Sequence, residues 1–315
     1  MKKILPAIFG LLLTALSAHA NIQELEYSVG STNDVSAYLL LNPPLPMLYY
    51  KKGDYQVAVK PYLYSGTFQS HSEGAGNFRG EAGAASISYG LADNWGLYVL
   101  SMGNELKGYF TYTQDPGRGG GLNTKINGNK TSFAMVSPAV VYQFFGEDQK
   151  GFTLPVMLGP LAYKTSFSQE FQQSQASDGA AVNDFDMRGD KTGFGVLAGV
   201  QAGIDMGRYF RFNPYLLFAF LQEGAYETSV SNVRLNNSTT EMGDALTPSG
   251  SLSTPTNVSP RGMFAPGLNF TYRPWGLSFN IASLILKNGL GFGDYVKGAS
   301  TTSYSVSWAF GNYVK

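Results

Sequence analysis

Apolar and small polar residues alternate at every second position in several parts of the chain. The clearest case is Ser303–Phe310, where aromatic or aliphatic residues alternate with serine and alanine. Similar alternation occurs in Ala85–Tyr89, Leu268–Tyr272 and Leu277–Ile281. Because successive strand side chains point to opposite faces, this pattern predicts strands with one apolar and one polar face.

Short polar turns separate some of these segments, and aromatic residues flank the turns. The turns are Leu91–Asn94, Gly146–Lys150, Asp205–Arg208 and Arg273–Pro274. Long stretches rich in Gly, Ser, Asn, Asp and Thr separate the other segments. Short turns at one end, long loops at the other and aromatic girdles are typical of bacterial outer-membrane barrels. We therefore predict an all-β fold, a closed antiparallel up-and-down transmembrane β-barrel.

The alternation predicts ten strands, at 55–66, 79–90, 95–110, 131–145, 151–165, 192–204, 209–223, 261–272, 276–287 and 301–311. An even number places both ends of the barrel on the short-turn, periplasmic side. The outer loops are then 67–78, 111–130, 166–191, 224–260 and 288–300. The fourth loop is long enough to contain another hairpin, so a twelve-stranded barrel is the alternative.

Six prolines fall inside these predicted strands, where each removes a donor from the hydrogen-bond ladder. They are Pro61, Pro138, Pro155, Pro160, Pro214 and Pro266. A closed barrel has no free edge to accommodate them. We interpret them as sites of bulges or kinks, unless some of the strands are assigned wrongly.

The same alternation assigns side chains to the two faces of the barrel wall. The polar candidates for lining the lumen are Lys60, Tyr62, Tyr64, Glu81, Gln143, Gln201, Arg211, Asn213, Tyr215, Asn269 and Asn280. The candidates for the aromatic girdles are Tyr89, Trp95, Phe144, Phe152, Tyr209, Phe210, Tyr272, Trp275, Trp308 and Phe310. Ten strands leave at most a narrow or plugged passage, because eight already fill their interior with side chains.

The N-terminus has the features of a secretory signal. Lys2 and Lys3 precede the apolar run Ile4–Leu16, and Ala18–Ala20 is a small-x-small cleavage site. We expect residues 1–20 to be removed, residues 21–53 to form a periplasmic or plug segment, and residues 54–315 to form the barrel. Within 21–53, a short helix is expected from Val35 to Leu41, ended by the prolines of 42–46. A plug in the lumen and a disordered periplasmic tail are equally compatible with this segment.

Composition excludes some classes of function. The chain has 22 basic and 22 acidic residues, so no positive excess points to nucleic acid. Cysteine is absent, so a large exported protein of this kind relies on its hydrogen-bonded sheet rather than on disulfides. No stretch after the signal is long and apolar enough for a membrane helix, which leaves a barrel as the means of spanning a bilayer.

Few residues suggest chemistry. His71 lies in Ser70-His71-Ser72-Glu73, and a nucleophile is activated by Ser, His and carboxylate groups together. Sequence neighbours seldom adopt triad geometry, so we interpret His71 as a solvated loop residue and expect no enzymatic activity; a membrane-embedded hydrolase is the alternative. Arg188 stands where a calcium loop needs an oxygen ligand, so Asp184–Asp190 is interpreted as a solvated acidic loop. No metal and no cofactor are expected.

The hairpin Tyr89–Leu97 and the terminal strand Tyr304–Phe310 resemble those of the small monomeric outer-membrane barrels of Gram-negative bacteria. That resemblance implies localisation in the outer membrane. Asp34–Pro43 has a fainter similarity to the N-terminal plug of the FadL-type transporters of hydrophobic compounds. Omptin proteases also form ten-stranded barrels, but the sequence shows no counterpart of their paired Asp and Asp-His constellation.

These observations favour a narrow passive channel or uptake barrel for small solutes, with hydrophobic solutes among the candidates. The alternative is a structural or surface-interaction barrel that acts, like an adhesin, through its long outer loops. The expected partners are outer-membrane lipid, lipopolysaccharide and the barrel-assembly machinery, with no nucleic acid. The protein is expected to be a monomer.

Overall fold

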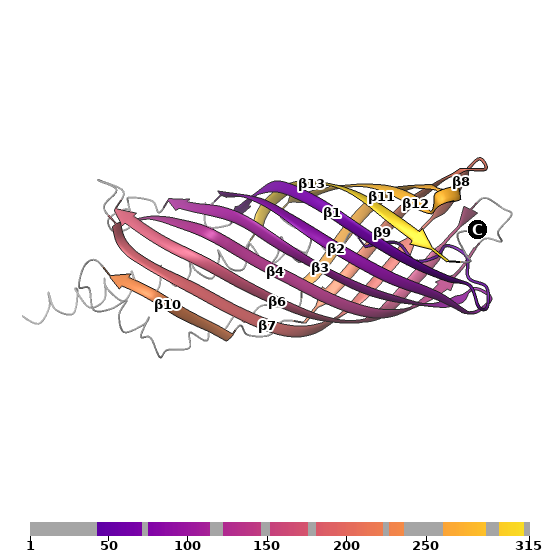
Figure 1. Cartoon of the computed structure of the whole chain (residues 1–315), viewed down its shortest axis with the longest axis horizontal. Coiled ribbons are helices and arrows are strands. Elements are labelled where there is room, and N and C mark those ends of the chain that lie inside the picture. The colour runs from indigo at the N-terminus through magenta and orange to yellow at the C-terminus, as the bar shows by residue number, and fades with distance from the viewer. Residues whose placement is uncertain are drawn as a thin grey trace, which may run out of the picture.

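In the part of the chain that the structure describes, ten strands form a closed antiparallel barrel (Figure 1). The computed structural model describes residues 43–70, 75–113, 122–145, 152–175, 181–222, 227–235, 261–287 and 296–311. The barrel strands are β1 (Tyr55–Ser70), β2 (Ala75–Ala92), β3 (Trp95–Thr113), β4 (Leu122–Gln143), β6 (Pro155–Gln175), β7 (Ala181–Gln201), β9 (Phe210–Leu221), β11 (Arg261–Tyr272), β12 (Leu277–Lys287) and β13 (Val296–Phe310). The predicted ten-stranded barrel is confirmed.

Pairing of β1 with β13 and of β7 with β9 completes the ring. The short strands β5 (Phe152–Thr153) and β8 (Gly203–Met206) pair with each other, and β8 continues along β9. At the opposite end, β10 (Glu227–Leu235) pairs with the outer part of β7. Because no second barrel neighbour pairs with β10 among the described residues, it lies outside the ring, and the twelve-stranded alternative is not realised there. A short 3-10 turn, η2 (Arg273–Trp275), connects β11 to β12.

Several strands reach further toward the outer end than predicted. β4 begins at Leu122, β6 ends at Gln175 and β7 begins at Ala181, inside segments expected to be loops. The expected acidic loop 184–190 is therefore strand, paired with β6 and β10. Backbone ladders need no apolar side chains once they leave the lipid, so the alternation ends before the strands do.

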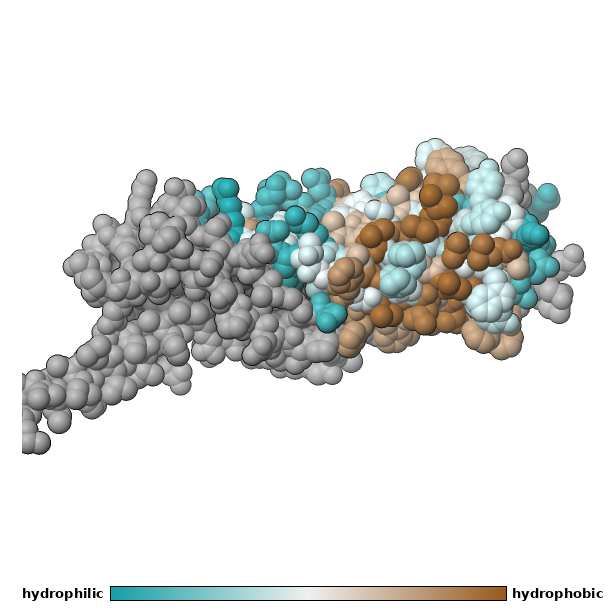
Figure 2. All heavy atoms as spheres, turned by 90° about the horizontal axis from the view of Figure 1, so that it is seen from below, coloured by the Kyte–Doolittle hydropathy of each residue, from teal (hydrophilic) through white to brown (hydrophobic). Residues whose placement is uncertain are grey.

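An apolar belt surrounds the half of the barrel nearest the short turns. Figure 2 shows hydrophobic residues gathered there, with hydrophilic residues beyond them. Leu63 and Phe194 are each 70% exposed in this belt. Farther out, Glu105 accepts from Lys107 at 2.9 Å and from Lys130 at 2.8 Å on the outer face. In outer-membrane barrels an outward-facing apolar band about 25 Å tall contacts the lipid, and charged residues lie beyond it.

No helix in the described part of the chain is long and apolar enough to cross a membrane.

All six prolines lie in barrel strands, five of them on the outward face. Between β4 and β6 the ladder has a gap around Pro138 and Pro160, where the Ser137 hydroxyl donates to the Pro160 carbonyl at 2.7 Å. The register is the same on both sides of this gap, from Val136↔Ala162 to Val140↔Leu158. The interpretation as a bulge is therefore wrong here: no residue is inserted, and a side-chain hydroxyl replaces a missing ladder bond.

The topology makes a direct labelling prediction. The chain has no cysteine, so single cysteines can be placed at Arg188, exposed on the outer part of β7, and at Asp93 in a short turn. A membrane-impermeant maleimide applied to intact cells should label Arg188→Cys but reach Asp93→Cys only after the outer membrane is opened. Labelling of Asp93→Cys in intact cells would reverse the assigned orientation.

Candidate functional site at the short-turn end of the lumen

Residues 43–50, which precede β1, lie inside the barrel. Pro43–Tyr50, here called the inner segment, is buried at every position except the half-buried Leu45. Met47 is 0% and Tyr50 is 1% exposed. Residues 43–46 include three prolines, which lack a backbone donor and favour extended chain, so this stretch cannot pair as a regular strand.

Barrel side chains hold the inner segment by bonding to its backbone. Four donate to consecutive carbonyls: Lys60 Nζ to Pro43 at 3.4 Å, Tyr98 OH to Pro44, Gln56 Nε2 to Leu45 at 3.3 Å and Gln201 Nε2 to Pro46 at 2.9 Å. Thr153 Oγ1 donates to the Leu48 carbonyl at 3.2 Å. The amides of Met47 and Tyr50 donate to Ser88 Oγ at 3.3 Å and Gln143 Oε1 at 3.1 Å. The segment is thus fixed from several strands at once.

Two glycines of the wall leave room for the apolar side chains of this segment. A Cβ on Gly96 would lie 2.1 Å from Cδ1 of Tyr50, and one on Gly203 would lie 2.7 Å from Cδ1 of Leu48. Such distances are far below ordinary contact, so any larger residue at either position must displace the segment. The wall is therefore shaped to receive the inner segment.

Ten of the eleven residues predicted to line the lumen are buried on the inner face of the wall. They are Lys60, Tyr62, Tyr64, Gln143, Gln201, Arg211, Asn213, Tyr215, Asn269 and Asn280. Glu81 is the exception, because it is exposed and points outward with Ile87 and Tyr89. The residue number of Glu81 differs by an even number from those of the two lipid-facing residues, so the period of two places it outside, and its assignment to the lumen is wrong.

Sequence reasoning missed several residues that contact the inner segment. Tyr98 is fully buried in the lumen, on the same face as the equally buried Leu100. Because the inner face of β3 carries such apolar side chains, it does not show the polar alternation used to predict the lumen. The spacing along the strand does indicate it, because the numbers of Tyr98 and the outward-facing Trp95 differ by an odd number, which places the two side chains on opposite faces.

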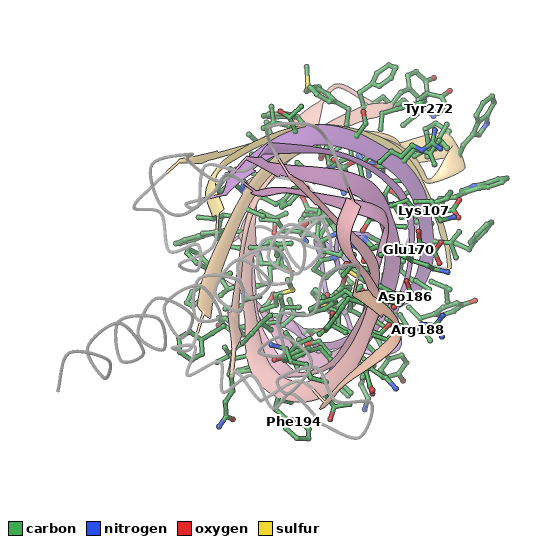
Figure 3. All side chains as sticks on the ribbon, turned by 90° about the vertical axis from the view of Figure 1, so that its left-hand side faces the viewer. Lys107, Glu170, Asp186, Arg188, Phe194 and Tyr272 are labelled. Atoms are coloured by element: carbon green, nitrogen blue, oxygen red, sulfur yellow. The ribbon has the colours of Figure 1, made fainter. Side chains whose placement is uncertain are left out.

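The predicted girdle aromatics all come from strand ends and turns at the short-turn end. Nine are exposed, and Tyr272 is half-buried. Several pack against each other, with ring centroids 4.7 Å apart for Trp95 and Tyr142 and 5.4 Å apart for Tyr272 and Trp275. Figure 3, which looks along the barrel from its outer end, shows Lys107, Phe194 and Tyr272 outside the wall.

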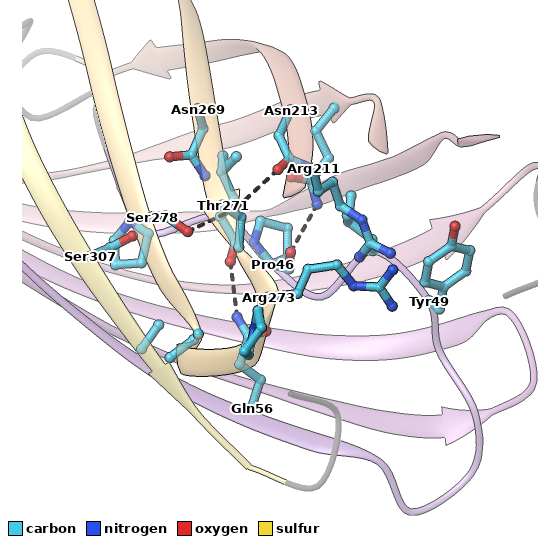
Figure 4. A pocket seen from close by; sticks show the side chains of 18 of the residues that line it. Pro46, Tyr49, Gln56, Arg211, Asn213, Asn269, Thr271, Arg273, Ser278 and Ser307 are labelled. Carbon is cyan, nitrogen blue, oxygen red and sulfur yellow. Dashed lines mark hydrogen bonds between the residues drawn. The ribbon is translucent and has the colours of Figure 1, made fainter. Parts of the chain in front are cut away.

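A cavity of about 870 Å³ lies beside the inner segment at this end (Figure 4). Polar and apolar side chains both line it, and its wall comes from β1, β7, β9, β11, β12 and β13. Thr271 Oγ1 donates to Asn213 Oδ1 at 3.2 Å and lies 2.8 Å from the Ser278 hydroxyl. These bonds join three strands and fix the shape of the wall.

Positive charge surrounds the cavity. Its lining includes Lys51, Arg208, Arg211 and Arg273, against the carboxylates of Asp54 and Asp205. Arg211 Nε donates to Asp205 Oδ1 at 2.5 Å, and Arg273 Nη1 lies 3.6 Å from Asp205 Oδ2. The Arg211 guanidinium also lies 5.2 Å from the centre of the Tyr49 ring, a cation–π contact with the inner segment.

No group of three or more metal-ligating side chains occurs among the described residues. His71 and the expected helix at 35–41 lie outside those residues, as do the signal at 1–20 and the turn at 146–150. The helix, the signal and the role of residues 21–42 therefore stay predictions.

Neither the family models nor the curated proteins contain a match to this chain. Among solved structures, it is similar to the outer membrane protease OmpT from Escherichia coli, at 10% identity over 82% of this chain and 97% of that chain, with a TM-score of 0.41. It is also similar to the translocator domain of the autotransporter NalP from Neisseria meningitidis, at 11% identity over 95% and 98%, with a TM-score of 0.43. A third is the outer membrane protein OprG from Pseudomonas aeruginosa, at 8% identity over 84% and 99%, with a TM-score of 0.32.

At these identities and TM-scores the three similarities carry no argument about the activity of this chain. The closed antiparallel ring and its apolar belt independently identify the present chain as an outer-membrane β-barrel. The similarity to the FadL-type transporters stays a prediction, because none of these structures bears on it.

One expectation needs correction. We expected no enzymatic activity, but one solved structure to which this chain is similar is an outer membrane protease. The similarity transfers no activity at 10% identity. The expectation of no enzymatic activity, which rested on the sequence neighbours of His71, is therefore withdrawn.

Proposed function

We propose that the barrel is a narrow passive channel for small solutes and that the inner segment closes its periplasmic end. The observation that carries this proposal is the burial of Pro43–Tyr50 within the ring, bound to side chains rather than paired with a strand. A segment of this kind obstructs the lumen without being part of the barrel.

The mode of attachment favours a movable closure. Most bonds from the wall come from single side chains, and one backbone amide, that of Asn94, donates to the Tyr50 carbonyl at 2.9 Å; such bonds contribute about 0.5–1.5 kcal/mol net each. Withdrawal of the segment breaks none of the strand pairings that close the ring. The barrel can therefore stay intact while its passage opens.

The buried charges favour anions in the passage. Arg211 is 6% exposed on the inner wall, and Lys51, Arg208 and Arg273 line the cavity at the same end. Asp205, the carboxylate bonded to Arg211, stands at the short-turn end of β8. Positive groups lining a narrow pore raise its selectivity for anions.

Planar-bilayer recordings with the purified protein test this proposal. In a salt gradient, the reversal potential should indicate an anion preference, and Arg211→Ala should shift it toward cations because a lumen charge is lost. Arg188→Ala, which removes an exposed arginine from the outer face of β7, is the matched control and should leave selectivity unchanged. An unchanged reversal potential in Arg211→Ala would contradict the charge assignment.

A second candidate is a surface-interaction barrel that acts through its outer part. The strands β4, β6 and β7 continue into the outer part of the barrel, and β10 adds a further strand to the side of β7 there (Figure 1). Absence of any current from the wild type and from a chain lacking the inner segment would favour this role over a channel.

A further inference from the structure

The cavity beside the inner segment has the properties of a binding site. A volume of about 870 Å³ lies within the range of small-molecule sites. The polar side chains of Asn269 and Ser307, 7% and 8% exposed, line this cavity. Gln201, only 4% exposed, lines it too, and its Oε1 lacks a partner among the described atoms. Buried acceptors without donors are costly, so hydroxyl groups or water are needed there.

The charged part of the lining lies at the mouth. Arg273 and Arg208 come from the two turns that flank this end of the wall, and both are exposed. Asp205 is already engaged by Arg211 and Arg273, which leaves the mouth with more positive than negative groups. Guanidinium groups bind carboxylates and phosphates through paired donors.

We propose that this cavity binds a small hydroxylated anion, such as a sugar acid or a sugar phosphate. Its hydroxyl groups bond to Asn269, Ser307 and Gln201, and its carboxylate or phosphate pairs with Arg273 and Arg208. Because Gln201 also holds the inner segment and Tyr49 of that segment stacks on Arg211, the bound solute lies directly against the closure. The role of this site rests on the proposed channel, but binding of the anion to the cavity can be measured independently of conductance.

Titration calorimetry on the full chain, purified in detergent, tests the site. Gluconate and glucose 6-phosphate are the probes that separate carboxylate from phosphate. Glucose has the hydroxyls without the charge, and hexanoate has the charge without the hydroxyls. We expect at least one of the two hydroxylated anions to bind, and glucose and hexanoate to bind at least tenfold more weakly.

Variants locate the binding. Arg273→Gln and Asn269→Val should each weaken binding of the hydroxylated anion at least fivefold. Arg79→Gln, at an exposed position on the outward face of β2, should leave it unchanged. The gel mobility shift on heating verifies that each barrel is folded.

The outcomes separate this inference from the channel. Equal binding of glucose and gluconate, or no binding of either anion by a folded barrel, overturns the proposed site. If the same barrel conducts current, the proposed channel is still supported. Binding of the anion by a barrel that never conducts, with or without the inner segment, supports the site and overturns the channel.

Discussion

Deletion of residues 21–50 is expected to raise the single-channel conductance of the purified barrel several-fold. The deletion removes the inner segment, which occupies the lumen at the short-turn end. It leaves every paired strand of the ring in place, because β1 begins at Tyr55. The measurement is the conductance of single insertions in a planar bilayer, compared with wild type at the same salt concentration.

A shorter deletion is the control. Removal of residues 21–42 alone keeps Pro43–Tyr50 and should leave the conductance near that of wild type. If both deletions give the same conductance, the inner segment does not obstruct the passage. Gly96→Val tests without a deletion whether the inner segment obstructs the passage, because the valine side chain collides with Tyr50. Gly83→Val is its control, because a Cβ at Gly83 meets nothing within 4 Å.

Leu268→Arg is expected to impair assembly of the barrel far more than Asn269→Arg. Leu268 is 45% exposed in the apolar belt, whereas Asn269 is 7% exposed and faces the cavity. An arginine facing lipid near the bilayer midplane costs roughly 2–4 kcal/mol, and an arginine in the polar cavity avoids that cost. The measurement is the yield of folded protein in outer-membrane fractions, determined from the gel mobility of heated and unheated samples.

The two variants add the same charge at neighbouring positions of β11, so they differ only in the face that receives it. Equal yields, or the lower yield for Asn269→Arg, would show that the assigned faces are reversed. Arg188→Gln, on the outward face beyond the belt, is expected to assemble like wild type.

The number and facing of the strands follow from the sequence because lipid imposes an apolar residue at every second position. The terminal strand shows this best, since Val306 and Trp308 are exposed while Ser305 and Ser307 are buried, as their alternation indicates. The misplaced Glu81 shows that parity along one strand is a better guide than polarity, since its charge suggested a lumen that its position excludes.

The strand ends were harder to predict. Outside the membrane, the ladder between β4 and β6 joins Leu122–Asn127 to Glu170–Gln175, where the sequence is polar and no alternation remains. Backbone hydrogen bonds hold these pairs, and they require no particular pattern of apolar side chains, so the sequence does not indicate them. The twelve-strand alternative came from the length of 224–260, of which the structure describes β10 alone.

The inner segment is the part of the site that the sequence indicated least well. Its prolines were interpreted as the end of a helix, which stays a prediction, and their carbonyls also accept from Lys60, Tyr98 and Gln201. These contacts join residues up to 155 positions apart, and such distances are set by closure of the ring. Local pattern therefore identifies the wall and its polar residues but not the segment that they hold.

A reversible covalent link tests most directly whether the inner segment closes the passage. The chain has no cysteine, and a Cβ on Gly203 would lie 2.7 Å from Cδ1 of Leu48, so Leu48→Cys and Gly203→Cys stand at two positions whose side chains meet. We expect wild type to show brief openings in bilayer recordings, oxidation of the double variant to abolish them, and reduction to restore them. Openings that continue after the disulfide has formed, or thiols that never join in the folded barrel, would contradict the closure.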